Sequence, residues 1–456
     1  MAYQGWLSLE GAELVNNSRT AAYARGFGIA GVGCVDCDDL AASLGDAPYT
    51  NPAADDAPWY DPAEPASARF AGLLALEFSG LSNGTGSRAA VDLLTDGATL
   101  QPLRYARREV VVRAVAVAAD DQALSYGIAW LASALRGSKC TGLCGAGPMC
   151  LYAYCPCCAD DAPDPCGDNA LRTVYETGLL EGPTVTDRSL LRNAALAMVE
   201  FTLVSGLPWL YREPVPIATI CDWVPVDEVD ECVEWIENPS LGPCGNTVGR
   251  GPRLRVRGPG RATFDADSVC DTGEDCLTDP NSGCPPQPVP PRPPVPPDPC
   301  TQVCFDATTN DEALVVIPPG ATPLWLDAVP LVKVTTGAQA MRGLTLTFYA
   351  NPTGAACTDD LLHDCAACSV LSVPYIPPDT TFIVDGRIQS AYAECQAAGL
   401  GKALNANASL YGADGGLFTW PVLDCGGGLC LRANVQTGHS PDACVDVSLV
   451  PREDAA

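Results

Sequence analysis

Residues that could carry out acid–base or nucleophilic chemistry are scarce in this chain. Its two histidines are His363, in LLHDC, and His439, in QTGHSP, and both contexts are typical of loops. Neither supports a histidine-based catalytic triad, and GxSxG, HExxH, Walker A and strand–GxGxxG–helix patterns do not occur. A catalytic carboxylate pair is compatible with the 55 acidic residues, although spacing alone does not identify one. We therefore expect no enzyme, no catalytic residue and no cofactor.

Cysteine is the one reactive residue type that is abundant, with 24 copies. Disulfide bonds explain this number better than metal clusters do, because histidine ligands are so few. Seven cysteines crowd the region 138–170, which is typical of an insertion loop held by disulfides. A Cys₄ zinc site is the alternative there, but its usual two well-separated CxxC-like pairs are missing. The structural disulfide candidates are Cys34, Cys37, Cys140, Cys144, Cys150, Cys155, Cys157, Cys158, Cys166, Cys284, Cys300, Cys425 and Cys430.

Spacing suggests partners for some of these cysteines. Cys34 and Cys37 either bond to each other or to distant partners, and a redox role would require a βαβ context that is absent. Cys425 and Cys430 flank GGGL and are expected to staple a hairpin. Fifteen cysteines precede the proline-rich segment and nine follow it. Since both counts are odd, full oxidation requires a bridge between the two parts or between subunits, for which Cys284–Cys300 is a candidate.

An acidic segment is the other possible ligand set. Six carboxylates lie between Asp265 and Asp279, enough to bind Ca²⁺. The EF-hand pattern is absent, however, because no glycine occupies the sixth position. A plain acidic turn region is the alternative, and we predict no metal ligand.

A proline-rich segment divides the chain. Residues 285–299 read PPQPVPPRPPVPPDP, and ten of the fifteen are proline. Such a segment joins neither helices nor central strands, and it forms a polyproline II rod of roughly 45 Å. The predicted organisation is an N-terminal domain at 1–220 with the cysteine-rich insertion, an irregular cysteine-rich extension at 221–284, the linker at 285–299, and a C-terminal domain at 300–456.

Charge and hydropathy exclude several functions. The formal net charge of −29 argues against nucleic-acid binding and against docking on anionic lipid. Five arginines at 250–261 form a basic strand that either pairs with an acidic neighbouring subunit or is solvated. No signal peptide and no membrane span are expected. A particle assembled in the cytosol and released by lysis would explain why a chain without an export signal is rich in cysteine.

Hydrophobic periodicity predicts a mainly β protein. Strands are expected at Trp6–Leu9, around Val111–Val117 and across the long run that ends at Gly206. One principal helix is expected after Asp120 and Asp121, with Leu124, Ile128, Leu131 and Leu135 in one stripe and Gly137 at its end. Short runs between residues 300 and 450, separated by Gly, Pro and Asn, predict a C-terminal β-sandwich or jelly-roll.

The order of these elements resembles the distal tail proteins of long-tailed bacteriophages, and more closely minor tail proteins of phages that infect actinobacteria. The resemblance is carried by MAYQGWLSLEG, REVVVRAVAVAADDQALSYGIAWLASALRG and VEFTLVSGLPWLYREPV, then by LTFYANPTG, VPYIPPDTTFIVDGRIQSA, GLFTWPVLDCGGGLC and VDVSLVPRE. It implies a structural virion protein at the tail tip, made in the host cytoplasm. It also implies a ring of six copies, built by the N-terminal domain, that joins the tail tube protein to hub and tip proteins of the baseplate. The C-terminal sandwich is implied to be galectin-like and to face outward.

Exposed aromatic residues support an alternative function. A tail-tip adhesin would bind host cell-wall glycan through its C-terminal sandwich, and the possible glycan contacts are Trp325, Tyr375, Tyr411 and Trp420. Most aromatic residues of sandwiches belong to the core, which is the structural alternative for each of them. A cell-wall hydrolase is a further alternative that the lack of catalytic motifs disfavours.

Overall fold

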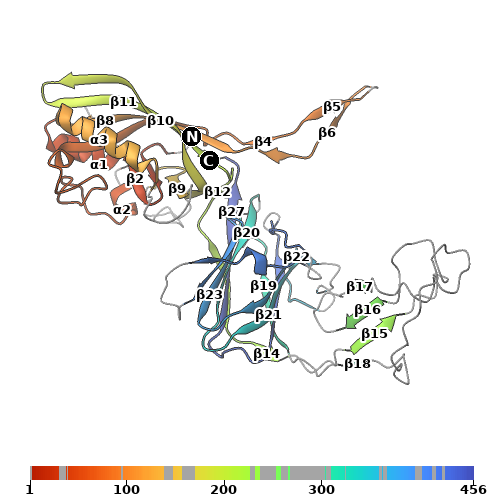
Figure 1. Cartoon of the computed structure of the whole chain (residues 1–456). Helices are drawn as coiled ribbons and strands as arrows, with labels where there is room; N and C mark the ends of the chain where they lie inside the picture. Colours follow the sequence, from red (N-terminus) through yellow and green to blue (C-terminus); the bar gives the residue numbers. More distant parts are fainter. Residues whose placement is uncertain are drawn as a thin grey trace, which may run out of the picture. The chain divides into compact units, whose positions relative to one another are not determined.

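The chain is mainly β and divides into two compact units (Figure 1). The computed structural model describes residues 3–29, 37, 40–93, 96–137, 147–156, 170–225, 310–323, 325–358, 362, 367–395, 403–412, 417–423 and 427–455, with the backbone of strands at 232–236, 253–257, 265–267 and 303–304. Unit 1 comprises Met1–Val215, Leu326–Val329 and Leu449–Ala456, and unit 2 comprises Pro216–Trp325 and Pro330–Ser448. Among the described residues, no helix has the length and apolar character needed to span a bilayer.

Antiparallel strands build unit 1. β1 (Trp6–Leu9) lies between β2 (Ala12–Asn16) and β9 (Gly147–Tyr152). β10 (Leu171–Leu191) pairs first with β9 and then, from Thr177 onward, with β11 (Ala194–Ser205). β11 pairs with β8 (Arg108–Ala118), which pairs with β3 (Phe70–Ser79). Alternate side chains of β11 are buried, which confirms the predicted two-residue period.

The predicted principal helix is present as α3 (Asp121–Ala134). The Asp120 carboxylate caps it by accepting a hydrogen bond from the Ala123 N–H at 2.9 Å. Gly137 follows the helix with a φ of +76°, a conformation that favours glycine. Gly127 lets the helix approach the Phe70 ring closely, because a Cβ at this position would lie 2.2 Å from Phe70 Cε2. The helix thereby covers the apolar core of unit 1.

A second substantial helix was not predicted from the sequence. α1 (Asn17–Gly26) occupies a stretch whose polar residues suggest turns, and the short α2 (Leu40–Ser43) and the 3₁₀ turn η1 (Ser67–Arg69) lie nearby in the sequence. The Asn16 side chain caps α1 by accepting from the Arg19 N–H at 2.9 Å. Tyr23 is fully buried against the core, so tertiary packing outweighs the weak helical pattern here.

An exposed two-stranded arm leaves unit 1 between β3 and β8. β4 (Gly86–Ser87) pairs with β7 (Arg104–Tyr105), and β5 (Ala90–Asp92) pairs with β6 (Ala98–Leu100). Figure 1 shows these strands leading away from the rest of the unit. Every described residue from 86 to 107 is exposed. We call residues 84–106 the arm; the sequence indicated strands there but not their projection.

Unit 2 is built from two antiparallel sheets. One has the order β14 (Val224–Pro225), β19 (Asn310–Ile317), β26 (Leu429–Gln436), β21 (Met341–Ala350) and β22 (Ala367–Ile376). The other contains β13 (Val215–Ile220), β27 (Cys444–Glu453), β20 (Asp327–Thr335), β23 (Thr380–Asp385), β24 (Ser390–Cys395) and β25 (Leu404–Asn405). Alternate residues are buried over most of β23, β26 and β27, as expected for a sandwich.

A further four-stranded sheet lies in the region expected to be irregular. Its order is β17 (Asp265–Asp267), β16 (Arg253–Arg257), β15 (Cys232–Ile236) and β18 (Val303–Cys304). The predicted basic strand is therefore β16, and its register sets Arg253 opposite Asp267 and Arg255 opposite Asp265 within this chain. The linker at 285–299 lies outside the described residues.

The unit boundaries differ from the expected domain boundaries at two places. Leu326–Val329 and Leu449–Ala456 belong to unit 1, although both lie within the predicted C-terminal domain. Unit 2 also begins before the expected extension, at Pro216. The sequence gives no sign of this arrangement, because β20 and β27 read as ordinary sandwich strands over their whole lengths.

Three disulfides lie in the described residues, and they revise the expected pairings. Cys37 bonds to Cys155, so the proposed Cys34–Cys37 bridge is wrong and the distant-partner alternative applies. Cys430 bonds to Cys357, so the predicted Cys425–Cys430 staple is wrong, and the third bond is Cys221–Cys444. Cys150 was a disulfide candidate but is a free thiol, as is Cys368. The candidates outside the described residues are Cys34, Cys140, Cys144, Cys157, Cys158, Cys166, Cys284, Cys300 and Cys425.

Candidate functional site

The arm offers an apolar surface that its own unit does not cover. Its exposed large apolar side chains are Val91, Leu93, Leu100, Leu103 and Tyr105. The arm carries two arginines and two aspartates, and is therefore formally neutral in a chain with a net charge of −29. An isolated two-stranded hairpin is marginally stable in water. The arm therefore suits a contact with another surface that covers these apolar side chains.

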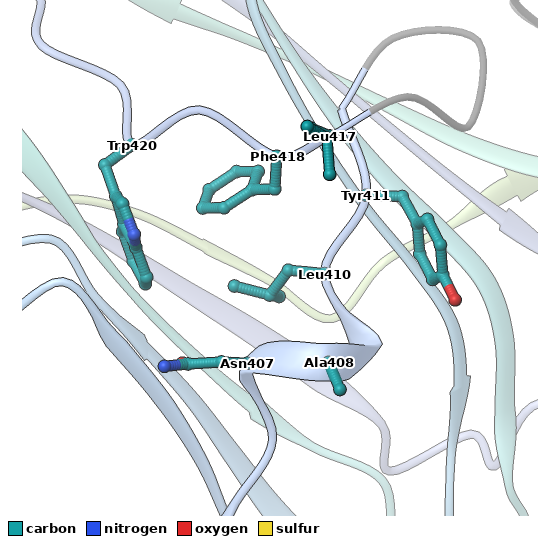
Figure 2. Close-up of a pocket in the computed structure, with 7 residues that line it drawn as sticks. All are labelled: Asn407, Ala408, Leu410, Tyr411, Leu417, Phe418 and Trp420. Atoms are coloured by element: carbon teal, nitrogen blue, oxygen red, sulfur yellow. The ribbon is translucent and has the colours of Figure 1, made fainter.

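An aromatic pocket of about 570 Å³ lies in unit 2. Figure 2 shows the rings of Trp420 and Phe418 beside Leu410, with Tyr411 on the far side of Leu410 from Trp420. The Phe418 and Trp420 rings meet nearly edge to face, with centroids 4.9 Å apart. We call the seven lining residues the aromatic pocket; they are Asn407, Ala408, Leu410, Tyr411, Leu417, Phe418 and Trp420.

Backbone pairing fixes the pocket residues. Tyr411 forms an isolated bridge with Ser372 of β22, in which each N–H donates to the other carbonyl at 2.9 Å. Leu417 pairs with Tyr411 from the other side, and a Cβ on Gly412 would lie 2.7 Å from the Leu417 carbonyl oxygen. Glycine is thus required for the close approach of these two segments. Leu417 itself is 97% exposed at the pocket edge.

The 3₁₀ turn η4 (Asn407–Ser409) supplies the polar end of the pocket. The Asn407 Oδ1 accepts a hydrogen bond from the Ala391 N–H of β24 at 2.5 Å. This bond orients the side-chain amide, so its N–H₂ group is the end that remains for a ligand. The pocket thus combines aromatic and aliphatic walls with one oriented amide, a composition typical of small-molecule sites.

Two of the four predicted glycan contacts meet in this pocket, and two lie elsewhere. Tyr411 and Trp420 line it, whereas Trp325 and Tyr375 are exposed outside it. Phe418, Leu410 and Asn407 were not predicted. Only the clustering of aromatic residues at 411–420 signals the pocket in the sequence.

The most perturbed titratable groups form a buried network in unit 1, unrelated to any predicted site. Arg19 pairs with Glu13 at 2.9 Å and with Asp46 at 3.0 Å, and the Tyr49 hydroxyl donates to Asp46 at 2.6 Å. Burial raises the pKa of Glu13, against the opposing influence of Arg19. Burial also raises the pKa of Tyr23 and of Tyr49. Because these groups pair with one another, we interpret the network as one that stabilises the fold.

The remaining chemical candidates give no assembled centre in the described part of the chain. The His439 Nε2 lies 3.0 Å from the Asp311 carboxylate, and its Nδ1 lies 3.0 Å from the Ser440 carbonyl oxygen. Both ring nitrogens therefore contact groups other than a nucleophilic hydroxyl. His363 lies outside the described residues, as does most of the acidic segment 265–279. Among the described residues, no three Cys, His, Asp or Glu side chains form a metal-binding group.

The solved structures that are similar to this chain include two from bacteriophages. One is the SPP1 Dit (gp 19.1) protein, a paradigm of hub adsorption apparatus in Gram-positive infecting phages, with 11% identity and a TM-score of 0.36 over 85% of this chain and 95% of that one. The other is the phage P2 baseplate in its activated conformation with Ca, with 6% identity and a TM-score of 0.38 over 84% and 92%. No family model and no curated protein matches this chain.

Proposed function

We propose that this chain is a structural protein of a bacteriophage tail tip, without catalytic activity, that assembles through its arm into a ring of six copies. In the virion it joins the tail tube protein to hub and tip proteins. The observation that carries the proposal is the arm, which exposes apolar side chains on a ribbon too thin to bury them itself. The elements on which the sequence resemblance rests support it, namely β8 followed directly by α3, with β11 further along the chain.

A second copy of this chain is the partner that the arm fits best. The arm is formally neutral, with two arginines and two aspartates in residues 84–106, so the strongly acidic body of another copy does not repel it. A contact from the arm of one copy to the body of the next is heterologous, and such contacts form a ring when the rotation closes. At ~3.3 Å per residue, the roughly ten residues of each arm strand reach about 35 Å, enough to overlap a neighbouring domain.

A single charged substitution tests the assembly role. Leu100→Asp places a carboxylate on the arm, where Leu100 is 62% exposed. Leu404→Asp is the matched control, because Leu404 is 59% exposed on unit 2. Sedimentation velocity at micromolar concentrations should show hexamers for the parent chain and for Leu404→Asp, but mainly monomers for Leu100→Asp.

Two results would contradict this proposal. A parent chain that stays monomeric throughout the micromolar range excludes self-assembly through the arm. A Leu100→Asp variant that assembles like the parent excludes the arm as the contact. Imaging of a virion that carries a tagged copy then tests its position at the tail tip and its copy number.

The aromatic pocket favours a second function, binding of host cell-wall glycan. Its volume of about 570 Å³ lies within the range of small-molecule sites. The apolar faces of sugar rings stack on aromatic side chains such as Trp420, and the Asn407 amide offers donors to sugar hydroxyls. Both functions are compatible in one protein, because arm and pocket belong to different units.

Binding of the full chain to isolated cell walls tests this second function. Trp420→Ala should reduce the bound fraction, whereas Trp325→Ala should not, because Trp325 is an exposed tryptophan outside the pocket. Equal binding by both variants and the parent would remove the pocket from consideration. Soluble cell-wall fragments should quench the tryptophan fluorescence of the parent chain but not that of the Trp420→Ala variant.

A further inference from the structure

The base of the arm is built around one buried arginine. Arg108 is the first residue of β8, directly after the arm, and its side chain is fully buried. Its Nε donates to the Pro208 carbonyl at 2.7 Å, and Nη1 donates to the carbonyls of Gly80, Leu81 and Asn83 at 2.8, 3.3 and 3.1 Å. A buried guanidinium is tolerated only when its donors are satisfied. These bonds hold the chain entering the arm against the chain leaving it.

Asp454 completes the base from a distant part of the sequence. Arg108 Nη2 donates to the Asp454 carbonyl at 2.5 Å and lies 3.4 Å from its carboxylate. That carboxylate also accepts hydrogen bonds from the Thr85 N–H and hydroxyl, at 2.9 and 2.7 Å, and from the Gly86 N–H at 3.3 Å. Thr85, just before β4, is thus attached to a residue 369 positions away.

The other strand of the arm is attached to the same distant segment. The Tyr105 ring of β7 packs against Trp209, with centroids 4.4 Å apart. The Arg452 guanidinium lies over this same Trp209 ring, 4.0 Å from the ring centroid. Residues 452–454 therefore contact the start of the arm directly through Asp454 and its end indirectly, through Trp209.

The segment that carries these contacts is itself firmly held in unit 1. Glu453 pairs with Leu210 of β12 (Leu210–Tyr211), and its buried carboxylate binds Arg172 and, at 2.9 Å, Arg212. The Arg212 N–H donates to the Pro451 carbonyl at 3.0 Å. Asp454 is thus presented to the arm from a fixed strand.

We infer that residues 449–454 are a positioning element that sets the direction of the arm. Asp454 and Arg108 are the residues that couple this element to the arm. This inference rests on the proposed function, since the arm is taken as the assembly contact. It adds a condition to assembly: the arm is not fixed until residue 454 has been synthesised and β27 has formed. Chains that have not folded through residue 454 would then be poor partners for the ring.

Hydrogen exchange of the full chain, kept dilute so that it is monomeric, tests the coupling directly. Asp454→Ala should speed exchange in peptides covering residues 84–106 by roughly 10- to 100-fold, because hydrogen bonds to a charged acceptor are lost. Asp187→Ala, which removes an exposed carboxylate elsewhere in unit 1, should leave the arm unchanged. Trypsin should cut at Arg88, Arg104 and Arg107 faster in Asp454→Ala than in the control.

A milder variant covers the case in which Asp454→Ala fails to fold. Thr85→Val removes one donor to the Asp454 carboxylate and leaves residues 449–454 intact. It should also speed exchange of the arm, with unchanged exchange in α3. Unaltered arm exchange and cleavage in both variants would overturn the inference.

Sedimentation of the same variants separates this inference from the proposed function. Weaker assembly of Asp454→Ala than of Asp187→Ala supports both. A loosened arm in a protein whose parent chain is monomeric refutes the ring while leaving the positioning role in place.

Discussion

Replacing Glu453 by Gln should destabilise unit 1 strongly, because this carboxylate is the shared partner of two arginines. Its side chain is 5% exposed, and those of Arg172 and Arg212 are 4% and 17% exposed. Burial lowers the pKa of Arg172, and Glu453 is the group that opposes this effect. Glutamine keeps the volume of the side chain and removes only its charge. The substitution therefore isolates the ionic interaction.

The size of the effect follows from this burial. Removing one partner of a buried ion pair costs about 3–5 kcal/mol, and the lower end applies here because Arg212 retains some contact with solvent. For a domain of roughly 200 residues, each kcal/mol lowers the Tm by about 2–4 °C. A loss of about 3 kcal/mol therefore predicts a Tm lower by roughly 6–12 °C.

Differential scanning calorimetry of the full chain measures this change, and Glu109→Gln provides the matched control. Glu109 pairs with Arg107 at 2.7 Å, but both side chains are largely exposed. Such surface pairs contribute about 0–1 kcal/mol, so the control should lower the Tm by no more than a few degrees. Equal Tm values for the two variants would refute the reasoning that burial determines the strength of the Glu453 pairs.

Three further predictions concern packing, ionisation and sulfur chemistry. Gly127→Ala should lower the Tm despite a helix-propensity gain of up to ~1 kcal/mol, because the new Cβ would clash with the Phe70 ring. A higher Tm would contradict this, and adding Phe70→Leu should relieve the loss. Burial raises the pKa of Tyr49, so the folded state keeps a proton that the unfolded chain releases near pH 10. Urea unfolding should therefore show a free energy of unfolding that falls above pH 10, and falls less steeply in Tyr49→Phe. Equal slopes of this free energy against pH in the two proteins would count against the prediction. Cys357→Ala should lower stability by about 2–4 kcal/mol, with no further loss on adding Cys430→Ala, whereas additive losses would exclude a shared bond.

Elements with strong local signals were predictable from the sequence. α3 carries a cap at Asp120, an apolar stripe and a terminal glycine, and each of these lies where expected. β11 shows a clear two-residue period because one of its faces is buried. In both cases the local pattern and the tertiary packing favour the same structure, so the sequence alone is sufficient.

Features that depend on distant partners could not be predicted in the same way. α1 has a weak apolar stripe and is stabilised by burial of Tyr23. The Cys357–Cys430 bond overrides the nearer Cys425, because geometry and not spacing decides the pairing. For the arm, the sequence shows strand-forming residues, but the absence of a covering element is a property of the folded unit. The aromatic pocket likewise depends on the pairing of Tyr411 with Ser372 of β22 on one side and with Leu417 on the other, which the linear order does not show.

The division of the chain has a mechanical consequence. The backbone passes between the two units four times, after residues 215, 325, 329 and 448, so a tensile load on unit 2 is shared by several covalent connections. The Cys221–Cys444 bond ties the first segment of unit 2 to its last, across 223 positions of sequence. A protease that cuts one of these four connections leaves the two units covalently attached through the others. In a protein whose domains are joined by a single linker, one cut would separate them. Such redundancy would suit the proposed tail-tip role, in which the protein has to withstand pulling.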